Sequence, residues 1–375
     1  MRFAWPSWPC YVQEHRAAVL RVIESNQLYA AKEVAAFEDE FSAYTKAKYA
    51  IGMGNATQGL QLALAALGVG IGDEVIVTPY SWISSASAVL MQNAIPVFVD
   101  IETETFGICP KAFEEAISPR TKAIILVHMF GLSSKVFEIR EICRRRGILL
   151  VEDASHAHGA KLHGQHLGTM GEIGVFSLHQ RKAISTGDGG ILCTNNENIC
   201  IKLKRLRSFG DKQLSYNYRM TEFSAALGRV GLLHLDCQNK IRQNNHRILA
   251  ETVNSKKISV IEPQADSEGV FYSNLLLIHL PREKQEALLK DAEVAGLPLK
   301  RTWQPLHQHP HFDRSHMINR KAPWDFAEIP IPEPASLQLK NSETYQKSLL
   351  FELDCHPLVP PDLVKKAGEW LREKV

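Results

Sequence analysis

The chain has 375 residues, 45% of them hydrophobic and 22% charged, which describes a globular protein with room for one large and one smaller domain. Its net charge of +2, with no basic stripe interleaved with aromatic residues, gives no support for nucleic-acid binding. No apolar run is long enough to span a membrane.

Seven cysteines are spread widely along the chain, and none forms a C-x-x-C pair. An odd, widely spaced set favours reduced thiols over a disulfide framework or a zinc site. We recognise no signal peptide. We therefore expect a cytoplasmic protein without a metal site.

The first nine residues, MRFAWPSWP, predict an ordered arm whose tryptophans pack on the body of the protein. Apolar residues at helical spacing then predict helices over residues 11–25 and 32–45.

A strand over residues 49–54 ends at a glycine, and Asn55-Ala56-Thr57 then introduces a helix over 58–67. This order makes an anion site, because the free N–H groups and the dipole of a helix N-terminus both attract a phosphate. Asn55 or Thr57 can also be an ordinary N-cap, and the two roles are compatible.

The middle of the chain alternates apolar runs with helical segments. Strands are predicted over residues 73–79, 95–101, 123–128, 148–152, 173–178 and 191–194. Helices are predicted up to residue 91, over 110–117, and over 136–146, where Gly147 can cap the end. The alternation predicts an α/β fold, with a large, mostly parallel sheet covered by helices on both faces.

The rest of the chain reads as further helices and a second, smaller unit. Helices are predicted over 197–207, 221–236 and, as a separate polar helix, 240–252. The second unit contains a strand over 273–279 and helices over 282–295 and 361–374. We therefore predict a large domain, residues 1–245, and a small C-terminal α+β domain, residues 246–375.

Two candidate catalytic side chains follow neighbouring strands. Asp153 ends one apolar strand, and Lys182 comes in a polar segment after the strand at 173–178. Ligands of α/β sheets bind beyond the carboxyl ends of the strands, where both groups are expected. Taken alone, Asp153 could cap a turn and Lys182 could be a solvated loop lysine.

The motifs around these residues favour catalysis. They are EDASHAHGA from Glu152, G-x-x-G-x-F-S-x-H-x-x-K ending at Lys182, TGDGG from Thr186, and YNYRMTEFSAALG from Tyr216. In this order they resemble the DegT/DnrJ/EryC1/StrS family of sugar aminotransferases, which depend on pyridoxal 5′-phosphate (PLP). The resemblance fades after about Val253. It implies the PLP-dependent transferase fold of type I, as in aspartate aminotransferase.

The resemblance implies a role for each residue at a matching position. Lys182 would bind PLP and move protons, and Asp153 would keep the pyridine nitrogen protonated. The contacts to the PLP phosphate would come from Ala56, Thr57, Ser177 and, reaching across from a second subunit, Asn217. The last contact implies a homodimer.

Trp82 stands where the family has an aromatic residue stacked on the pyridine ring, although alone it would read as a core residue. His156 stands where many members have Gln, near O3′ of the cofactor, and a histidine there could titrate. Asp188 replaces the usual Glu. Members of the family that act as dehydratases carry His in place of the lysine, and this chain has Lys182.

Arg219 and His307 are candidate substrate contacts. The fork of Arg219 suits a carboxylate or phosphate, and it suits a structural ion pair equally well. His307 lies in a P-L-H segment that the family has near the substrate entrance. With His309 and His311 it invites a metal hypothesis, but Pro310 and the lack of a nearby cysteine or carboxylate argue against a metal.

These observations predict a PLP-dependent aminotransferase of amino-sugar biosynthesis, with L-glutamate or glutamine as the amino donor. The expected acceptor is a nucleotide-linked keto-deoxysugar. A keto-cyclitol such as scyllo-inosose is an alternative. It is favoured by the Trp-Pro pairs in the first nine residues, which resemble the start of the aminocyclitol and 3-amino-5-hydroxybenzoate branch of the family. A PLP lyase or dehydratase of the 3-amino-5-hydroxybenzoate synthase type and a non-enzymatic regulator are further alternatives. We expect no nucleic-acid and no membrane partner.

Overall fold

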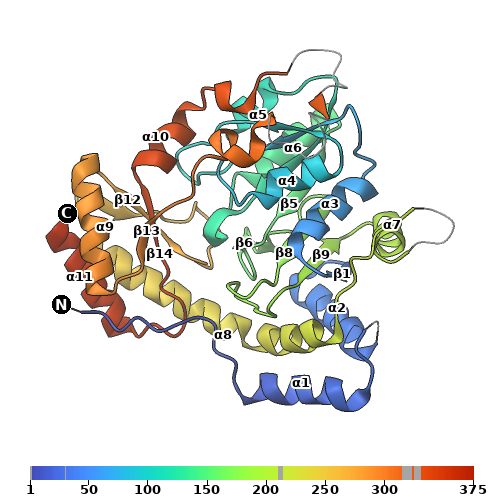
Figure 1. The fold of residues 1–375 in the computed structure, drawn as a ribbon, viewed down its shortest axis with the longest axis horizontal. Helices are drawn as coiled ribbons and strands as arrows, with labels where there is room; N and C mark the ends of the chain where they lie inside the picture. The colour runs from blue at the N-terminus through green and yellow to red at the C-terminus, as the bar shows by residue number, and fades with distance from the viewer. Residues whose placement is uncertain (1, 30, 210–213, 315–322, 325–330) are drawn as a thin grey trace.

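The structure is a computed structural model, and it describes residues 2–29, 31–209, 214–314, 323–324 and 331–375. Figure 1 shows a large sheet flanked by helices and, beside it, a smaller sheet with α9 (Arg282–Ala295) and α11 (Pro361–Lys374). The long helix α8 (Glu222–Val253) runs beneath both. Among the helices of the described residues, none combines the length and the apolarity that a membrane crossing requires.

The large sheet has seven strands in the order β1-β9-β8-β5-β4-β2-β3. Neighbouring strands are parallel except where β9 pairs with β1 and with β8. The bounds are β1 Tyr49–Met53, β2 Glu74–Val77, β3 Ile95–Phe98, β4 Thr121–Val127, β5 Leu149–Asp153, β8 Ile173–Ser177 and β9 Gly190–Thr194. The predicted large, mostly parallel sheet is confirmed.

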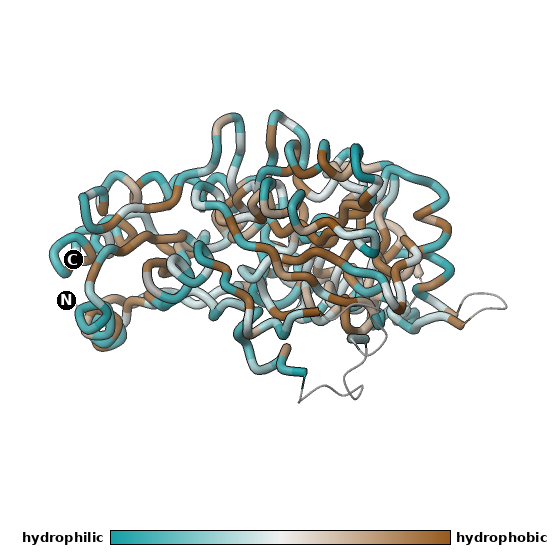
Figure 2. Tube along the Cα trace, turned by 90° about the horizontal axis from the view of Figure 1, so that it is seen from above, coloured by the Kyte–Doolittle hydropathy of each residue, from teal (hydrophilic) through white to brown (hydrophobic). Residues whose placement is uncertain are grey.

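Side chains of the large sheet alternate between two hydrophobic cores, one on each face. Along β2, Val75 and Val77 belong to one core and Ile76 to the other. Helices α3 (Ala56–Ala66), α4 (Ser84–Met91) and α7 (Glu197–Arg207) pack in the first core. Helices α2 (Lys32–Thr45), α5 (Pro110–Glu115), α6 (Val136–Arg146) and part of α8 pack in the second. Burial of both faces explains the continuous apolar runs, and Figure 2 shows hydrophobic residues gathered in the interior.

Helix α8 corrects one prediction. Residues 221–236 and 240–252 were expected to form two helices, but a single helix covers Glu222–Val253 and packs against α1 (Gln13–Ser25), α2 and α11. No glycine or proline breaks it between the two predicted segments. Its polar residues bond to the body of the protein: Asn239 Nδ2 donates to the His158 carbonyl at 2.8 Å.

The small sheet is antiparallel, in the order β10-β12-β14-β13. The bounds are β10 Ile258–Val260, β12 Asn274–Ile278, β13 Leu299–Arg301 and β14 Leu350–Leu353. With α9, α10 (Lys340–Ser348) and α11, it confirms the smaller α+β unit. The predicted domain boundary at residues 245 and 246 falls inside α8 and stays a prediction.

A third, short sheet joins the two parts of the chain. Its order is β11-β6-β7, with β6 Lys161–Leu162, β7 Gln165–His166 and β11 Ser267–Glu268. Because β11 comes from the C-terminal part and pairs with β6, the pairing links the second unit to the loop that follows β5.

Candidate active site

A cavity of about 640 Å³ lies beyond the carboxyl ends of the parallel strands, as the sheet topology leads one to expect. On one side of the cavity, which we call the large-sheet wall, the segments follow strands of the large sheet. The segments include Asn55–Thr57 after β1, Ser81 and Trp82 after β2, Asp153 at the end of β5, and Ser177 and Lys182 at the end of β8 and beyond it.

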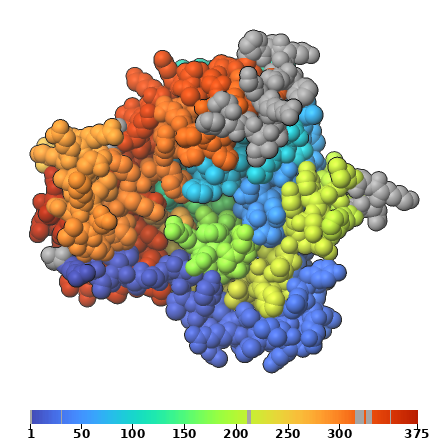
Figure 3. Space-filling view, viewed as in Figure 1, coloured from blue at the N-terminus to red at the C-terminus, as the bar shows by residue number. Residues whose placement is uncertain are grey.

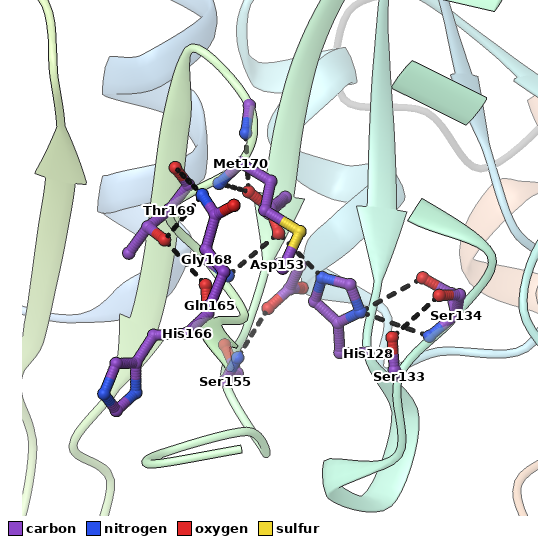
Figure 4. A network of polar contacts seen from close by, with 12 residues as sticks. His128, Ser133, Ser134, Asp153, Ser155, Gln165, His166, Gly168, Thr169 and Met170 are labelled. Atoms are coloured by element: carbon purple, nitrogen blue, oxygen red, sulfur yellow. Dashed lines mark hydrogen bonds and ion pairs between the residues drawn. The ribbon is translucent and has the colours of Figure 1, made fainter. Parts of the chain in front are cut away.

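The Asp153 carboxylate is buried and held from two sides. Ser85 Oγ, on α4, donates to Asp153 Oδ2 at 2.9 Å, and Ser85 is itself 2.7 Å from Ser81 Oγ. The Ser155 amide donates to Asp153 Oδ1 at 3.2 Å (Figure 4). The carboxylate therefore has one orientation relative to the cavity.

Glu152, the preceding residue, points to the opposite face of β5. Its carboxylate accepts hydrogen bonds from the amides of Gly168 at 2.8 Å and Met170 at 2.6 Å, and lies 2.9 Å from His128 Nε2. Figure 4 shows this buried network beside Asp153. The network fixes β5 to the loop that follows it and so steadies the position of Asp153.

Lys182 is partly buried in the same cavity. Its Nζ lies 4.7 Å from the centre of the Tyr272 ring. Burial lowers the pKa of Lys182 to about 8, although Asp153 and Glu352 oppose this by favouring the charged amine. About a tenth of the lysine is therefore neutral, and so nucleophilic, at pH 7, far more than for an ordinary lysine.

The N-terminus of α3 provides the expected anion site. Asn55 caps the helix by accepting from the Gln58 amide at 2.9 Å, which leaves the amides of Ala56 and Thr57 in the first turn. Thr57 Oγ1 lies 2.7 Å from Ser84 Oγ, and Ser177 also faces the cavity. Amides, hydroxyls and the helix dipole therefore meet here.

Gly190, at the start of β9, lets the sheet approach this helix N-terminus. A Cβ at Gly190 would lie 2.8 Å from the Ala56 nitrogen, closer than side-chain carbons pack. Close packing against the helix N-terminus therefore explains why the last residue of the TGDGG motif, Gly190, is a glycine.

Trp82 lies at the cavity and is 55% exposed. Its ring meets Trp303 edge to face, with the ring centres 5.6 Å apart. Because Trp82 is more than half exposed at the cavity, part of its ring surface is available to a flat ligand.

His156 is buried in a stack of aromatic rings. The Tyr272 ring lies parallel to it, with centres 4.1 Å apart, and Phe130 stacks at 5.8 Å. Its Nδ1 accepts from the Phe130 amide at 3.3 Å, so the ring proton lies on Nε2. Burial, and next the charge of Lys182, lower the pKa of His156 well below the usual value. The sequence left open that His156 changes its protonation near neutral pH. Because its pKa is lowered, we do not expect this change.

The structure brings seven of the predicted site residues to this one cavity: Ala56, Thr57, Trp82, Asp153, His156, Ser177 and Lys182. Three others lie outside it. Asn217 is exposed and accepts from Arg219 Nε at 3.1 Å, and Arg219 lies over the rings of Tyr29 and Phe209. Asn217 and Arg219 therefore do not reach the cavity of their own chain.

His307 is almost fully buried, in a short 3-10 helix, Leu306–Gln308. Its Nε2 lies 3.6 Å from the Glu343 carboxylate, and its ring lies against Phe98. It is not among the described residues that line the cavity. The expected contact between His307 and substrate therefore has no support in the geometry. Among the described residues, no group of three or more His, Cys, Asp or Glu side chains is arranged to hold a metal.

The opposite side of the cavity was not predicted. It consists of Tyr272, Lys300, Trp303 and Glu352, which we call the small-sheet wall. Lys300 on β13 and Glu352 on β14 are cross-strand partners, with Nζ and Oε1 2.9 Å apart. Burial raises the pKa of Glu352, and Lys300 opposes that rise. These residues carry no motif, so the sequence offered no signal for them.

The sequence of this chain is similar to those of a known enzyme family. The model of the DegT/DnrJ/EryC1/StrS aminotransferase family matches residues 9–329. The chain is 32% identical to L-glutamine:2-deoxy-scyllo-inosose aminotransferase of Streptoalloteichus tenebrarius, covering 81% of this chain and 78% of that protein. It is also 32% identical to GDP-perosamine synthase of Caulobacter vibrioides, covering 74% of this chain and 77% of that protein.

The fold of this chain agrees with the match to the family model. The crystal structure of 3-amino-5-hydroxybenzoic acid synthase superposes with a TM-score of 0.85 at 27% identity, covering 98% of each chain. This confirms the predicted fold class, and the aminotransferases of the family depend on PLP. The chain belongs to the DegT/DnrJ/EryC1/StrS aminotransferase family, and it is an aminotransferase.

Proposed function

We propose that this chain binds PLP in the cavity and transfers an amino group from L-glutamate or glutamine to a keto sugar. The observation that carries this proposal is the pairing of Lys182, whose pKa is lowered to about 8, with the fixed Asp153 carboxylate in one cavity. The donor set fits PLP, which needs an amine for its aldehyde, a carboxylate for its ring nitrogen and an anion site for its phosphate.

Each residue has a defined part in the proposed mechanism. PLP, when bound, supplies a conjugated ring that withdraws electrons from the carbon bearing the amino group. Asp153 would keep the pyridine nitrogen protonated, and His156 would offer its Nε2 proton to O3′. Lys182 Nζ would hold the proton removed from the α-carbon of the donor and, in the second half-reaction, would deliver one to the reacting carbon of the acceptor.

The phosphate would be held by the amides and hydroxyls at the N-terminus of α3 and by Ser177, with Trp82 against the ring. Asn217 would reach the phosphate of a second subunit. Its exposure, next to Arg219 and the exposed rings of Tyr29 (63%) and Phe209 (64%), supports a homodimer that covers this surface.

The acceptor that we propose is a nucleotide-linked keto-deoxysugar, and the protein would act in the cytoplasm. The relative GDP-perosamine synthase is named for a nucleotide-linked sugar. Arg181 supports the same choice, since it lines the cavity, is exposed and has no ion pair among the described residues. Its guanidinium suits a diphosphate.

A keto-cyclitol is the second candidate acceptor. The relative that acts on 2-deoxy-scyllo-inosose is as similar in sequence as the nucleotide-sugar relative, at 32% identity in both cases. A cyclitol carries no phosphate, so its binding would depend on hydroxyl contacts rather than on Arg181.

The test is the visible absorption spectrum of the purified protein before and after addition of L-glutamate or L-glutamine. We expect a PLP band that collapses when the donor is added and recovers with the correct keto sugar or keto-cyclitol. A PLP band that does not change when either donor is added, combined with release of water from the substrate, would favour the lyase alternative. Absence of a band after addition of PLP would overturn the proposal.

A further inference from the structure

The N-terminal arm, residues 2–9, connects the small sheet with the loop that carries Lys182. Figure 1 shows it running from the N-terminus near α11 toward the centre of the molecule, and Figure 3 shows it lying on the surface. On the small-sheet side, the Trp5 indole Nε1 donates to the Asp354 carbonyl at 3.0 Å.

At the other end of the arm, Trp8 contacts Lys182 directly. The indole Nε1 donates to the main-chain carbonyl of Lys182 at 3.2 Å. The amide of Lys182 donates to the His179 carbonyl at 2.8 Å. Both peptide groups of the lysine are therefore held, one within its loop and one by the arm.

Neighbouring side chains hold the Trp8 ring in place. The guanidinium of Arg242, which is 2% exposed on α8, lies 4.9 Å from the ring, and the His356 ring lies 5.8 Å away. Because these neighbours come from the core helix and from the C-terminal unit, the direction of the indole N–H is set by the packed body.

Tyr11 adds a second contact to the same loop. The Ser185 hydroxyl donates to the Gln180 carbonyl at 2.7 Å, so it accepts from the Tyr11 hydroxyl at 2.9 Å. The N-terminal segment therefore contacts the loop at Lys182 and again at Ser185.

We propose that Trp8, supported by Tyr11, is a positioning residue that sets where the Lys182 amine can reach. A lysine side chain is long and flexible, so the position of its main chain limits which atoms Nζ can approach. The bond from Trp8 fixes that main chain relative to Asp153 and Tyr272. The inference rests on the proposed role of Lys182 as the PLP-binding lysine.

The test replaces Trp8 by Phe, which keeps an aromatic ring beside Arg242 and removes the N–H donor together with one ring of the indole. Hydrogen exchange of the full chain, followed in the peptide over residues 178–186, should accelerate about fivefold, as expected from the loss of one hydrogen bond. The PLP band should change its pH dependence, and kcat should fall while KM changes little. Ile184, fully buried, keeps the loop folded in the variant.

Trp5→Phe is the matched control, since it removes an indole bond of the same arm to a carbonyl away from Lys182. It should leave exchange in this peptide and the PLP band unchanged. Unchanged exchange in Trp8→Phe, or equal acceleration in Trp5→Phe, would overturn the inference. If Trp8→Phe fails to fold, Tyr11→Phe must accelerate the same peptide, and unchanged exchange there counts against the inference. Exchange needs no cofactor, so a wild-type protein without a PLP band would refute the proposed function separately.

Discussion

The two sides of the cavity differ in how the chain builds them. In the large-sheet wall, Asp153, Ser177 and Lys182 come from one stretch of the chain, residues 153–182, at the ends of neighbouring strands. The small-sheet wall brings Tyr272, Lys300 and Glu352 together from three distant segments. The first wall carries groups that can bond to a cofactor, whereas the second surrounds the lysine and adjusts its charge. Changes in the first should abolish activity, and changes in the second should tune it.

Lys182→Ala should have the largest effect. The variant loses the amine that binds PLP and moves protons, so we expect kcat/KM to fall by more than about 10⁴-fold. Circular dichroism should show an intact fold, because the loop keeps its main-chain bonds. Near-normal transamination by this variant would exclude Lys182 from the mechanism.

Asp153→Asn should have the next largest effect. The amide fits the same space but cannot keep a proton on the pyridine nitrogen, so kcat should fall on the order of a thousandfold while PLP still binds. Turnover with L-glutamate and the PLP band measure the two effects. Ser85→Ala is the control: it removes one hydrogen bond to the carboxylate and should cost only about fivefold. Equal losses in both variants would mean that geometry matters more than charge.

Tyr272→Ala tests the small-sheet wall. The ring lies 4.7 Å from Lys182 Nζ and 4.1 Å from His156, so its removal lets water reach the amine. The pKa of Lys182 should rise from about 8 toward its usual value, and kcat should fall about tenfold at neutral pH. Tyr272→Phe keeps the ring and should stay within about twofold of wild type. A large loss in Tyr272→Phe would show instead that the hydroxyl takes part in the reaction.

An assay across two subunits tests whether Asn217 contributes to the site of a second subunit, as we propose. Asn217→Ala and Lys182→Ala chains, mixed after unfolding and refolding, should recover about a quarter of wild-type activity, because each mixed dimer contains one intact site. Size-exclusion chromatography with light scattering gives the oligomeric state. No recovery in mixed dimers would mean that Asn217 acts within its own chain, whereas full activity of Asn217→Ala alone would mean that Asn217 plays no part.

The large-sheet wall could be predicted because motif, strand and catalytic residue lie close together in the sequence. The end of an apolar run locates Asp153, and strand ends meet at one edge of a parallel sheet. Ser85 was missed because its role depends on how α4 is placed next to the end of β5, which no local sequence pattern records.

The small-sheet wall could not be predicted for a related reason. Lys300 faces Glu352 only because β13 and β14 pair in one register, and the strands have three and four residues. Segments this short leave no clear periodicity. The position of the His307 side chain could not be predicted for a similar reason, because the turn of its short 3-10 helix directs the ring toward Phe98.

Glu352→Gln should have the smallest effect, and its sign is informative. The Lys182 amine is protonated below a pKa of about 8 and neutral above it, and the Glu352 charge raises that pKa. Only the neutral amine attacks the PLP aldehyde, so PLP uptake by cofactor-free protein should speed up with pH and level off above about 8. In Glu352→Gln this midpoint should move to lower pH, by less than about one unit. Glu343→Gln, beside His307 and outside the cavity, should leave the midpoint unchanged. A midpoint that moves to higher pH in Glu352→Gln would mean that the carboxylate acts on Lys182 through packing rather than through its charge.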